Sequence, residues 1–413
     1  MARRALHIAG ASVVVGGILL MTAACSSSGG SGTGSTDTNS SSASDTTSSS
    51  PAATDSSSAA AADWSTAASA QAGGGMDALV AAAKAEGQLN VITLPRNWAN
   101  YGELMDNFTA KYGIKITDDN PDGSSAQELE AITSLKGQDR APDVVDVGMA
   151  FAYQGAQQSL YAPYQVSTWS DIPDGAKEAT GLWFNDYGGV MSIGCDASKI
   201  KTCPTSYTQL DDPAYKGAVA LNGDPTGANA AINAVAAVAL AKGGSLDNVQ
   251  PGIDFFAKLN KDGIYKPIQP SAATVESGET PIVLNWDYLN AANTKDVNAK
   301  GHKWTVTIPT DTTPLAGYYA QAINATAPHP AAARLWEEYL FSADGQNGFL
   351  KGGARPVEQD AMTTAGTIDA TLAAALPKVP GSPVLPNEKQ STDIGNLLVS
   401  KWPTEVGKFQ SGS

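Results

Sequence analysis

The chain has 413 residues, with 26 basic side chains from lysine and arginine against 41 acidic ones, and a formal charge of −15 at pH 7. This balance argues against nucleic acid as a partner, because binding to a phosphate backbone needs a concentration of positive charge. The length exceeds what a single hydrophobic core usually supports, so we expect the globular part to form two lobes.

The first thirty residues have the pattern of an export signal. Arg3 and Arg4 precede an apolar run over residues 8–21, and small residues then lead to Cys25. This order is typical of a secretory signal, and the run is shorter than the ~20 residues that span a bilayer. The letters TAAC that end at Cys25 resemble the bacterial lipobox, although threonine stands where that motif usually has an aliphatic residue. We therefore expect a lipoprotein signal peptide over residues 1–24 and an extracytoplasmic protein held on the cell membrane by lipid on Cys25. An uncut anchor and a freely secreted protein are the alternatives.

Residues 25–75 are expected to form a disordered tether. The segment consists mainly of serine, glycine, threonine, alanine and aspartate, and Trp64 is its only aromatic residue. Such a composition buries too little surface to offset the entropy lost on ordering. About 45 flexible residues span roughly 35 to 40 Å on average, so the tether would lift the body away from the membrane.

From Met76 onward, helix and strand patterns alternate. Ser125 and Glu128 have the spacing of a capping box at the start of one helix. The alternation predicts an α/β fold with a parallel sheet, in which ligands bind beyond the carboxyl ends of the strands. The predicted elements are a helix over 76–86, a strand over 89–94, a helix over 101–112, a strand over 114–117, a helix over 125–135 and a strand over 143–147.

A second α/β set follows the first. Between the two sets, Cys195 and Cys203 form an even pair, for which we expect a local disulfide in an exported protein. A metal or redox site is the alternative, but two thiols alone do not complete a zinc shell. The predicted elements of this set are strands over 218–221, 281–285 and 304–308 and helices over 228–242, 253–259 and 335–341, with Phe349 and Leu350 in the next helix.

Four segments resemble, in their order along the chain, the extracellular solute-binding proteins of bacterial ABC importers. Within that family, residues 98–102 (WANYG) and 120–125 (NPDGSS) look most like the spermidine/putrescine-binding branch, while the opening helix and strand also resemble ferric-iron and phosphonate binders. The four segments are residues 79–92 (LVAAAKAEGQLNVI), 212–220 (DPAYKGAVA), 327–333 (APHPAAA) and 342–346 (SADGQ).

The resemblance implies a type II periplasmic-binding-protein-like fold, with mixed, mostly parallel sheets and a hinge between two lobes. Lobe 1 would comprise residues 76–190 and about 309–352, and lobe 2 residues 191–308 and about 353–413 with the C-terminal helices. Such a protein would hold one small solute between its lobes and deliver it to a membrane permease and its ATPase. We expect a monomer without a cofactor or bound metal.

Candidate ligand-binding residues lie in the loops at the predicted strand ends and near the first crossover. Asp287, between Trp286 and Tyr288, is the strongest candidate, because an aromatic ring face attracts an organic cation and a carboxylate pairs with its N–H groups. This favours a polyamine or a similar cation. The full set is Arg96, Asn97, Trp98, Ser124, Ser125, Asp146, Trp183, Tyr187, Thr226, Trp286, Asp287 and Tyr288.

Other solutes stay open. Ser124, Ser125 and Thr226 stand at predicted helix starts, where backbone N–H groups can bind a phosphonate or another anion. Tyr318 and Tyr319 resemble the adjacent tyrosines with which ferric binders hold iron, whereas His302 and His329 stand apart from them in the sequence.

An enzyme is the less favoured class. The sequence has no G-x-S-x-G, no H-E-x-x-H and no phosphate-binding loop with its lysine. A lipid-anchored enzyme or adhesin is the remaining alternative to a transport receptor.

Overall fold

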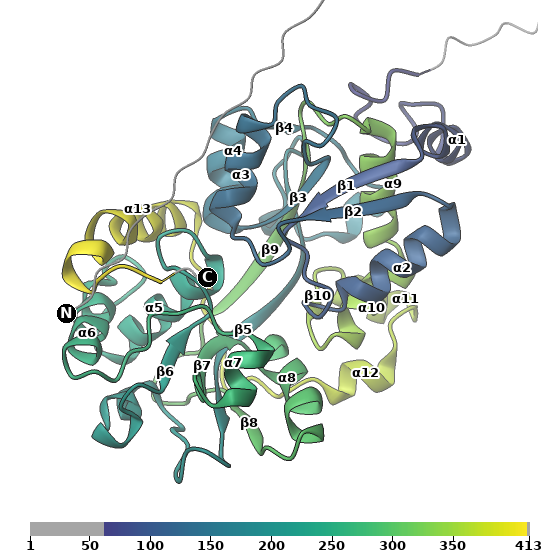
Figure 1. Ribbon diagram of the computed structural model, residues 1–413. Coiled ribbons are helices and arrows are strands. Elements are labelled where there is room, and N and C mark those ends of the chain that lie inside the picture. The colour runs from purple at the N-terminus through teal and green to yellow at the C-terminus, as the bar shows by residue number, and fades with distance from the viewer. Residues whose placement is uncertain (1–61, 411–413) are drawn as a thin grey trace, which may run out of the picture. The chain divides into compact units, whose positions relative to one another are not determined.

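The computed structural model of the chain describes residues 62–410 (Figure 1). The expected signal peptide, Cys25 and most of the expected tether lie outside the described residues.

The strands are β1 Gln88–Ile92, β2 Lys115–Asp119, β3 Val144–Gly148, β4 Tyr161–Ala162, β5 Phe184–Asp196, β6 Val219–Leu221, β7 Ile282–Trp286, β8 Trp304–Thr307, β9 Ala316–Asn324 and β10 Arg355–Pro356. The α-helices are α1 Met76–Glu86, α2 Tyr101–Tyr112, α3 Ser125–Ser134, α4 Met149–Gln157, α5 Asn229–Ala241, α6 Gln250–Lys261, α7 Ala272–Ser277, α8 Asp287–Ala299, α9 Pro330–Leu340, α10 Ala343–Lys351, α11 Gln359–Ala365, α12 Ala370–Ala375 and α13 Glu388–Glu405. Short 3-10 helices span Trp169–Asp171, Asp174–Ala176, Tyr207–Asp211 and Pro213–Tyr215.

Lobe 1 is built around β1, β2 and β3, with α1, α2, α3, α4 and α9 packed around these strands (Figure 1). β1 and β2 pair in parallel, with Gln88 opposite Lys115. The apolar face of α2 buries Phe108, whose ring lies 5.2 Å from that of Trp336 on α9. The ring of Tyr101, the first residue of α2, lies 6.4 Å from the same Trp336 ring. These contacts hold α2 against α9, and the start of α2 carries part of the site described below.

Lobe 2 holds β6, β7 and β8 with α5, α6, α7 and α8 (Figure 1). β6 and β7 pair in parallel, with Leu221 opposite Leu284. α5 is apolar on nearly all sides and almost entirely buried, as expected for a helix enclosed by its neighbours. α8 starts directly after β7, and α5 follows β6 after the turn over residues 222–228, so both helix starts lie near the ends of these strands.

The two lobes are joined by the long strands β5 and β9. The first part of β5 pairs with β9, and its second part pairs with β7 and β8 in lobe 2. β9 in turn pairs with β3 of lobe 1, so one sheet runs in the order β3-β9-β5-β7-β6. The structure therefore has the mixed α/β, two-lobe arrangement expected from the sequence, with both crossing strands between the lobes. The expectation of mostly parallel sheets is wrong, because among the described strands only β1–β2 and β6–β7 pair in parallel, and the crossing strands pair antiparallel with all their neighbours.

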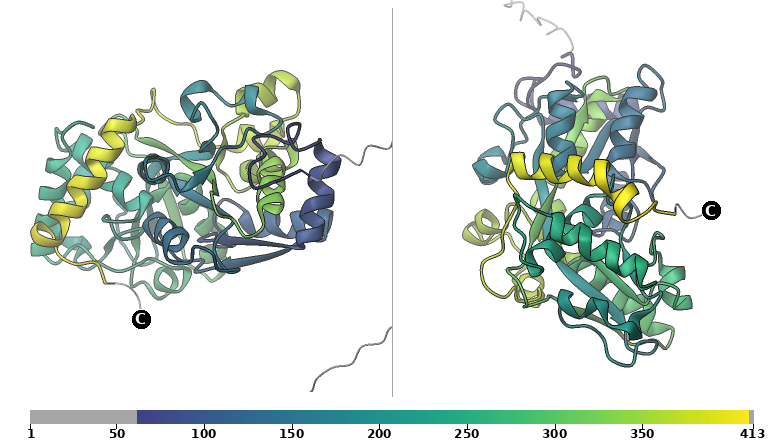
Figure 2. Two further views of the ribbon diagram at one scale, coloured as in Figure 1. Left: turned by 90° about the horizontal axis from the view of Figure 1, so that it is seen from above. Right: turned by 90° about the vertical axis from the view of Figure 1, so that its left-hand side faces the viewer.

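The C-terminal helices are divided between the lobes. Asn347 of α10 donates to the Thr367 carbonyl (2.9 Å) and accepts from the Asp369 N–H (2.7 Å), which ties α11 and α12 to a helix that packs on lobe 1. Residues near 367–369 thus contact lobe 1, whereas the sequence predicted that lobe 2 resumes at about residue 353. α13 packs on α4 of lobe 1 and on α5 and α6 of lobe 2, and Figure 2 shows this yellow helix lying across both.

The last part of the expected tether is folded. Trp64 is buried, and a side chain at Gly73 would clash with its ring, because a Cβ there would lie 2.2 Å from a ring carbon. Arg334 of α9 donates to the carbonyls of Ala67 (2.8 Å) and Ser65 (3.2 Å). The prediction of a spacer up to residue 75 is therefore wrong for the described part, because one tryptophan and one buried arginine supply the contacts that the composition alone did not suggest.

Most predicted elements match the structure within a few residues. α1 and α2 have the predicted bounds, whereas the capping box of α3 is formed by Ser124 and Gln127, one residue before the predicted position. Cys195 and Cys203 form the expected disulfide bond. None of the helices in the described part of the chain combines the length and apolarity needed to cross a membrane.

Candidate binding site

The candidate site lies on one face of the sheet, where β3, β9 and β5 meet between the lobes. β3 and β9 pair antiparallel, with Asp146 opposite Gln321 and Gly148 opposite Tyr319. Side chains that are directly opposite, or two residues apart on one strand, share a face of the sheet. Asp146, Tyr319 and Gln321 therefore all face the same way.

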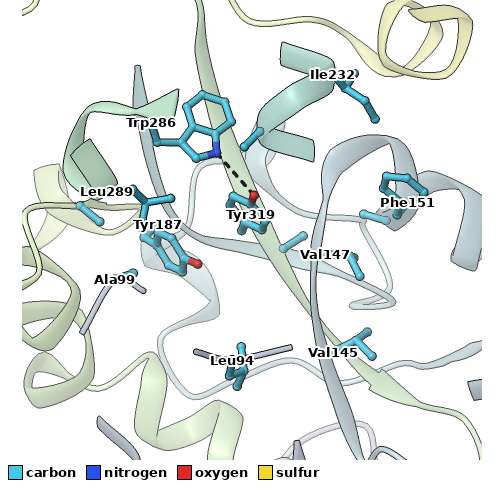
Figure 3. Packing of buried hydrophobic residues seen from close by; sticks show 14 of the residues in the cluster. Leu94, Ala99, Val145, Val147, Phe151, Tyr187, Ile232, Trp286, Leu289 and Tyr319 are labelled. Atoms are coloured by element: carbon cyan, nitrogen blue, oxygen red, sulfur yellow. Dashed lines mark hydrogen bonds between the residues drawn. The ribbon is translucent and has the colours of Figure 1, made fainter. Parts of the chain in front are cut away.

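Four aromatic side chains from three parts of the fold contact one another in a closed cycle. We call this group the aromatic box, and its members are Trp98, Tyr187, Tyr288 and Tyr319. Trp98 follows β1 in lobe 1, Tyr187 and Tyr319 belong to the crossing strands, and Tyr288 is at the start of α8 in lobe 2. The ring centroids are 5.6 Å apart for Trp98–Tyr319, 6.5 Å for Trp98–Tyr288, 5.8 Å for Tyr187–Tyr288 and 5.7 Å for Tyr187–Tyr319. Figure 3 shows Tyr187 and Tyr319 beside Trp286, whose indole N–H donates to the Tyr319 hydroxyl (3.4 Å).

The loop that carries Trp98 is held in a strained backbone. Ala99 and Asn100 have φ angles of 42° and 68°, in the left-handed region that residues with a side chain seldom adopt. The end of α10 fixes them, because the Asn100 side chain donates to the Gly348 carbonyl (3.1 Å) and a Cβ at Gly352 would lie 2.7 Å from the Ala99 carbonyl carbon. Strain of this kind is common at ligand sites, and these contacts fix the loop that carries Trp98.

Asp146 lies beneath the box and is joined to it by hydrogen bonds. Its Oδ2 accepts from the hydroxyls of Tyr101 (2.9 Å) and Tyr187 (2.8 Å). The Tyr187 hydroxyl in turn accepts from the indole N–H of Trp98 (2.8 Å). The carboxylate therefore orients two of the four rings of the box.

Further carboxyl groups surround Asp146. The Tyr101 hydroxyl also lies 3.2 Å from Asp186 Oδ2, although its single proton can serve only one of the two acids at a time. Burial raises the pKa of Asp186 to about 7, and burial together with the nearby Asp186 raises that of Asp146 well above its usual range. Burial also raises the pKa values of Glu128, whose Oε2 accepts from the Asp146 N–H (3.1 Å), and of Glu337. None of the ion pairs found within residues 62–410 involves these four acids, so this wall of the site has an excess of potential negative charge.

Several buried polar atoms around the box lack a hydrogen-bond partner in the described structure. They include Asp146 Oδ1, Gln321 Oε1, the Tyr288 hydroxyl and Asn229 Nδ2. Leaving such groups unpaired costs about 1 to 3 kcal/mol each. Their presence at the junction of the lobes marks a place where a ligand could supply the missing partners.

Asp287 is also buried, but both of its oxygens are already engaged. Oδ1 accepts from the Val190 N–H (3.0 Å), and Oδ2 pairs with Arg355 (2.8 Å). The carboxylate thus links α8 to β5 and β10, and it has an internal counter-charge. The sequence predicted Asp287 as the partner of a cation, but in the structure Arg355 already neutralises this carboxylate, whereas no described ion pair neutralises Asp146.

The remaining predicted residues divide between the site and its surroundings. Trp286 contacts Tyr319 behind the box, while Trp183 packs edge-on against Tyr153 (5.3 Å). Arg96 and Asn97 are exposed, and Arg96 pairs with Asp106 on the outside of lobe 1.

The side-chain hydroxyls at the helix starts that were expected to bind an anion are engaged within the protein. Ser124 is engaged in the capping box of α3, and the Ser125 hydroxyl accepts from the Gly148 N–H (3.1 Å). The Thr226 hydroxyl donates to Asp224 (2.8 Å). These three groups therefore have partners within the protein.

Tyr101 and Asn229 were not predicted from the sequence, and Tyr319 was predicted only as a possible iron ligand. Tyr101 is the first residue of α2 and occupies an apolar position of that helix. Its hydrogen bond to Asp146 depends on how distant segments pack together, which the local sequence does not show. Asn229 follows the turn after β6, which was the one available signal.

The tyrosine pair does not form one metal site. Tyr318 and Tyr319 are consecutive on β9, so their side chains point to opposite faces of the sheet. Among the described residues, no group of three or more histidine, cysteine or acidic side chains has the arrangement of a metal site. His302 and His329 lie close to Asp196 (2.7 Å) and Asp143 (2.9 Å), away from the box.

The comparisons with known proteins identify the family. Residues 139–374 match the bacterial extracellular solute-binding protein family, and the chain belongs to it. No curated protein matches the sequence.

Solved structures of periplasmic binding proteins share the fold. AfuA from Actinobacillus pleuropneumoniae, with fructose-6-phosphate bound, has a TM-score of 0.60 and 19% identity over 77% of this chain and 98% of its own. A Listeria monocytogenes protein named for spermidine/putrescine transport has a TM-score of 0.59 and 12% identity over 77% and 99%. The ferric binding protein of Campylobacter jejuni has a TM-score of 0.58 and 15% identity over 78% and 100%. These names differ in their solutes, so the fold alone does not identify the ligand of this chain.

Proposed function

We propose that this solute-binding protein captures a small organic cation between its lobes, at the aromatic box and Asp146. The observation that carries the proposal is the buried Asp146 carboxyl group, which lies beside four aromatic rings and has one oxygen without a partner. The proposed ligand is an amine that is protonated at neutral pH. Polyamines belong to this class, which agrees with the resemblance of residues 98–102 and 120–125.

The chemistry of the box suits such a ligand. The face of an aromatic ring attracts a cation by about 0.5 to 2 kcal/mol, more when water is excluded. A buried carboxylate is costly unless it is paired, and an ammonium group supplies both the counter-charge and the N–H donors. One ligand group would thus satisfy Asp146 Oδ1 and contact the rings around it.

The same contacts explain how binding could close the lobes. Trp98 belongs to lobe 1, Tyr288 to lobe 2, and Tyr187 and Tyr319 to the strands between them. A cation that touches all four would favour the arrangement in which they are close. Because the rings now contact one another directly, Trp98 and Tyr288 have to separate before a ligand can enter.

Thermal shift and calorimetry with matched compounds test the proposal. We expect n-butylamine and 1,4-diaminobutane to raise the melting temperature, because a ligand that binds only the folded state stabilises it, and we expect the neutral analogue 1-butanol to have no effect. Fructose-6-phosphate serves as an anionic control, for which we expect no change in the melting temperature. Binding of 1-butanol as tight as that of the amine, or of fructose-6-phosphate alone, would overturn the proposal.

The cellular part of the proposal follows the family. The protein would act without catalysis as a monomeric receptor, anchored through lipid on Cys25, and it would deliver its solute to an ABC permease and the ATPase of that permease. Replacing the cysteine, Cys25→Ala, should release the protein into the medium or leave an uncut precursor. Normal processing with unchanged membrane attachment would contradict the anchor.

Ferric iron is a second candidate, because phenol groups are concentrated at the same place. The hydroxyls of Tyr101 and Tyr187 both bond to Asp146, and Tyr288 and Tyr319 lie beside them. Burial and the nearby acids raise the pKa of Tyr187, and bound ferric ion would have to displace its proton. A visible absorption band on addition of ferric citrate would favour iron, whereas its absence together with amine binding would favour the organic cation.

A further inference from the structure

Asn229 presents a free donor at the junction of the lobes. It is the first residue of α5 and is 5% exposed. Its Oδ1 accepts from the Asn233 side chain (2.9 Å), which fixes the orientation of the amide. Nδ2 then lies near the Tyr319 hydroxyl but makes no hydrogen bond of ordinary length in the described structure, so an acceptor atom of a ligand could satisfy it.

Two helices start at this same place. α4 begins after Gly148 and α5 after Ala228, and no described side chain caps either helix. A Cβ at Gly148 would lie 2.1 Å from Asn229 Cγ, so the amide rests directly on the backbone at the start of α4. Helix starts carry partial positive charge, which favours a negative group beside them.

The Asn229 amide and Asp146 lie on the same face of β3. Residues two apart on a strand share a face, and Asn229 occupies the space over Gly148, two residues from Asp146. At about 3.3 Å per residue, the two positions are roughly 6 to 7 Å apart along the strand. The site thus has an acidic end at Asp146 and, roughly 6 to 7 Å away, an end at Asn229 that donates hydrogen bonds.

We propose that the ligand is a short zwitterion, an ω-amino carboxylate of about four carbons, with its ammonium at Asp146 and its carboxylate at Asn229 and the starts of α4 and α5. The inference rests on the proposed function and narrows it. A diamine would place a second ammonium group beside an amide donor and two positive helix ends, which disfavours it. The four rings of the box contact one another in this structure, so binding requires the lobes to separate and close again.

Calorimetry with three probes of equal chain length tests the inference: 4-aminobutanoate, 1,4-diaminobutane and n-butylamine. We expect 4-aminobutanoate to bind at least tenfold more tightly than either of the others. In Asn229→Asp the order should reverse, because the new carboxylate repels the ligand carboxylate and attracts the second amine of the diamine. The exposed Asn248→Asp, the same change elsewhere in lobe 2, should leave the wild-type order intact.

The outcomes separate the two proposals. Equal or tighter binding of n-butylamine or 1,4-diaminobutane to the wild-type protein would overturn the zwitterion and leave the organic cation standing. Binding of none of the three amines, with binding of ferric citrate or fructose-6-phosphate, would overturn both. If Asn229→Asp does not fold, the wild-type series decides alone, and Asn229→Ala should reduce the preference for 4-aminobutanoate over n-butylamine to less than threefold.

Discussion

Asp146 and Asp287 are two buried carboxyl groups beside the same aromatic rings, and they differ in what neutralises them. Asp287 has Arg355 at 2.8 Å and a backbone N–H on its other oxygen. Asp146 has only neutral donors, all on one oxygen, and further acids nearby. Burial beside aromatic residues is therefore a weak indicator of a cation site, whereas a buried carboxyl group with no internal counter-charge is a stronger one.

Removal of the Asp287 charge should have the largest effect, and the effect should be on folding. In Asp287→Asn, Arg355, whose side chain is only 19% exposed, loses its ionic partner. Breaking a buried pair in this way costs about 3 to 5 kcal/mol, so we expect urea unfolding to show a loss near the lower figure. Asp106→Asn breaks the exposed pair with Arg96 and should cost about 0 to 1 kcal/mol. Equal losses in the two variants would remove the contrast between Asp287 and a surface carboxylate.

Changes to Trp98 should act mainly on binding. Trp98→Ala removes one ring of the box and the donor to Tyr187, and we expect a loss of about 1 to 2 kcal/mol in amine affinity. Trp98→Phe keeps a ring face and should lose less. Trp169→Phe, which changes another partly buried tryptophan of lobe 1, is the control and should leave affinity unchanged. If Trp98→Ala instead lowers stability and not affinity, the box is ordinary core packing.

The pH dependence should follow from the acids around Asp146. Asp186 has a pKa near 7 in the folded protein, above its ordinary value of 3.8, so the folded state holds a proton that the unfolded state has released. Folding stability should therefore decrease as the pH rises from about 4 to 7, and amine affinity should increase over the upper part of that range, because the cation prefers ionised acids. Calorimetry in buffers of different ionisation enthalpy should detect proton release on binding. Proton uptake would contradict the assignment of the ligand charge to this acid cluster.

The sequence predicted the fold better than the site. α2 begins and ends at the predicted residues, because local apolar spacing and a glycine after its end determine it. Trp98, Asp146, Tyr187 and Tyr288 were all named from the loops and crossover, and the structure brings them together. The choice between Asp146 and Asp287 depends on Arg355, a residue 68 positions further along the chain, and no local pattern shows that pairing.

Tyr101 and Asn229 show the same limit for the rest of the site. Each lies at a helix start, and each contributes to the site only because distant strands meet beside it. The tether prediction was wrong at its end for a similar reason, since Arg334, far along the chain, holds the backbone of residues 65 and 67.

The most direct test of the account compares Asp146→Asn with Asp287→Asn by calorimetry, at a temperature where both variants are folded, with whichever amine gives the largest thermal shift. Hydrogen bonds to charged groups contribute about 1.5 to 3 kcal/mol, so Asp146→Asn should lose at least tenfold in affinity. Asp287→Asn should stay within about threefold of the wild-type protein, since it loses a structural pair and no ligand contact. A large loss in Asp287→Asn with unchanged binding in Asp146→Asn would contradict the account.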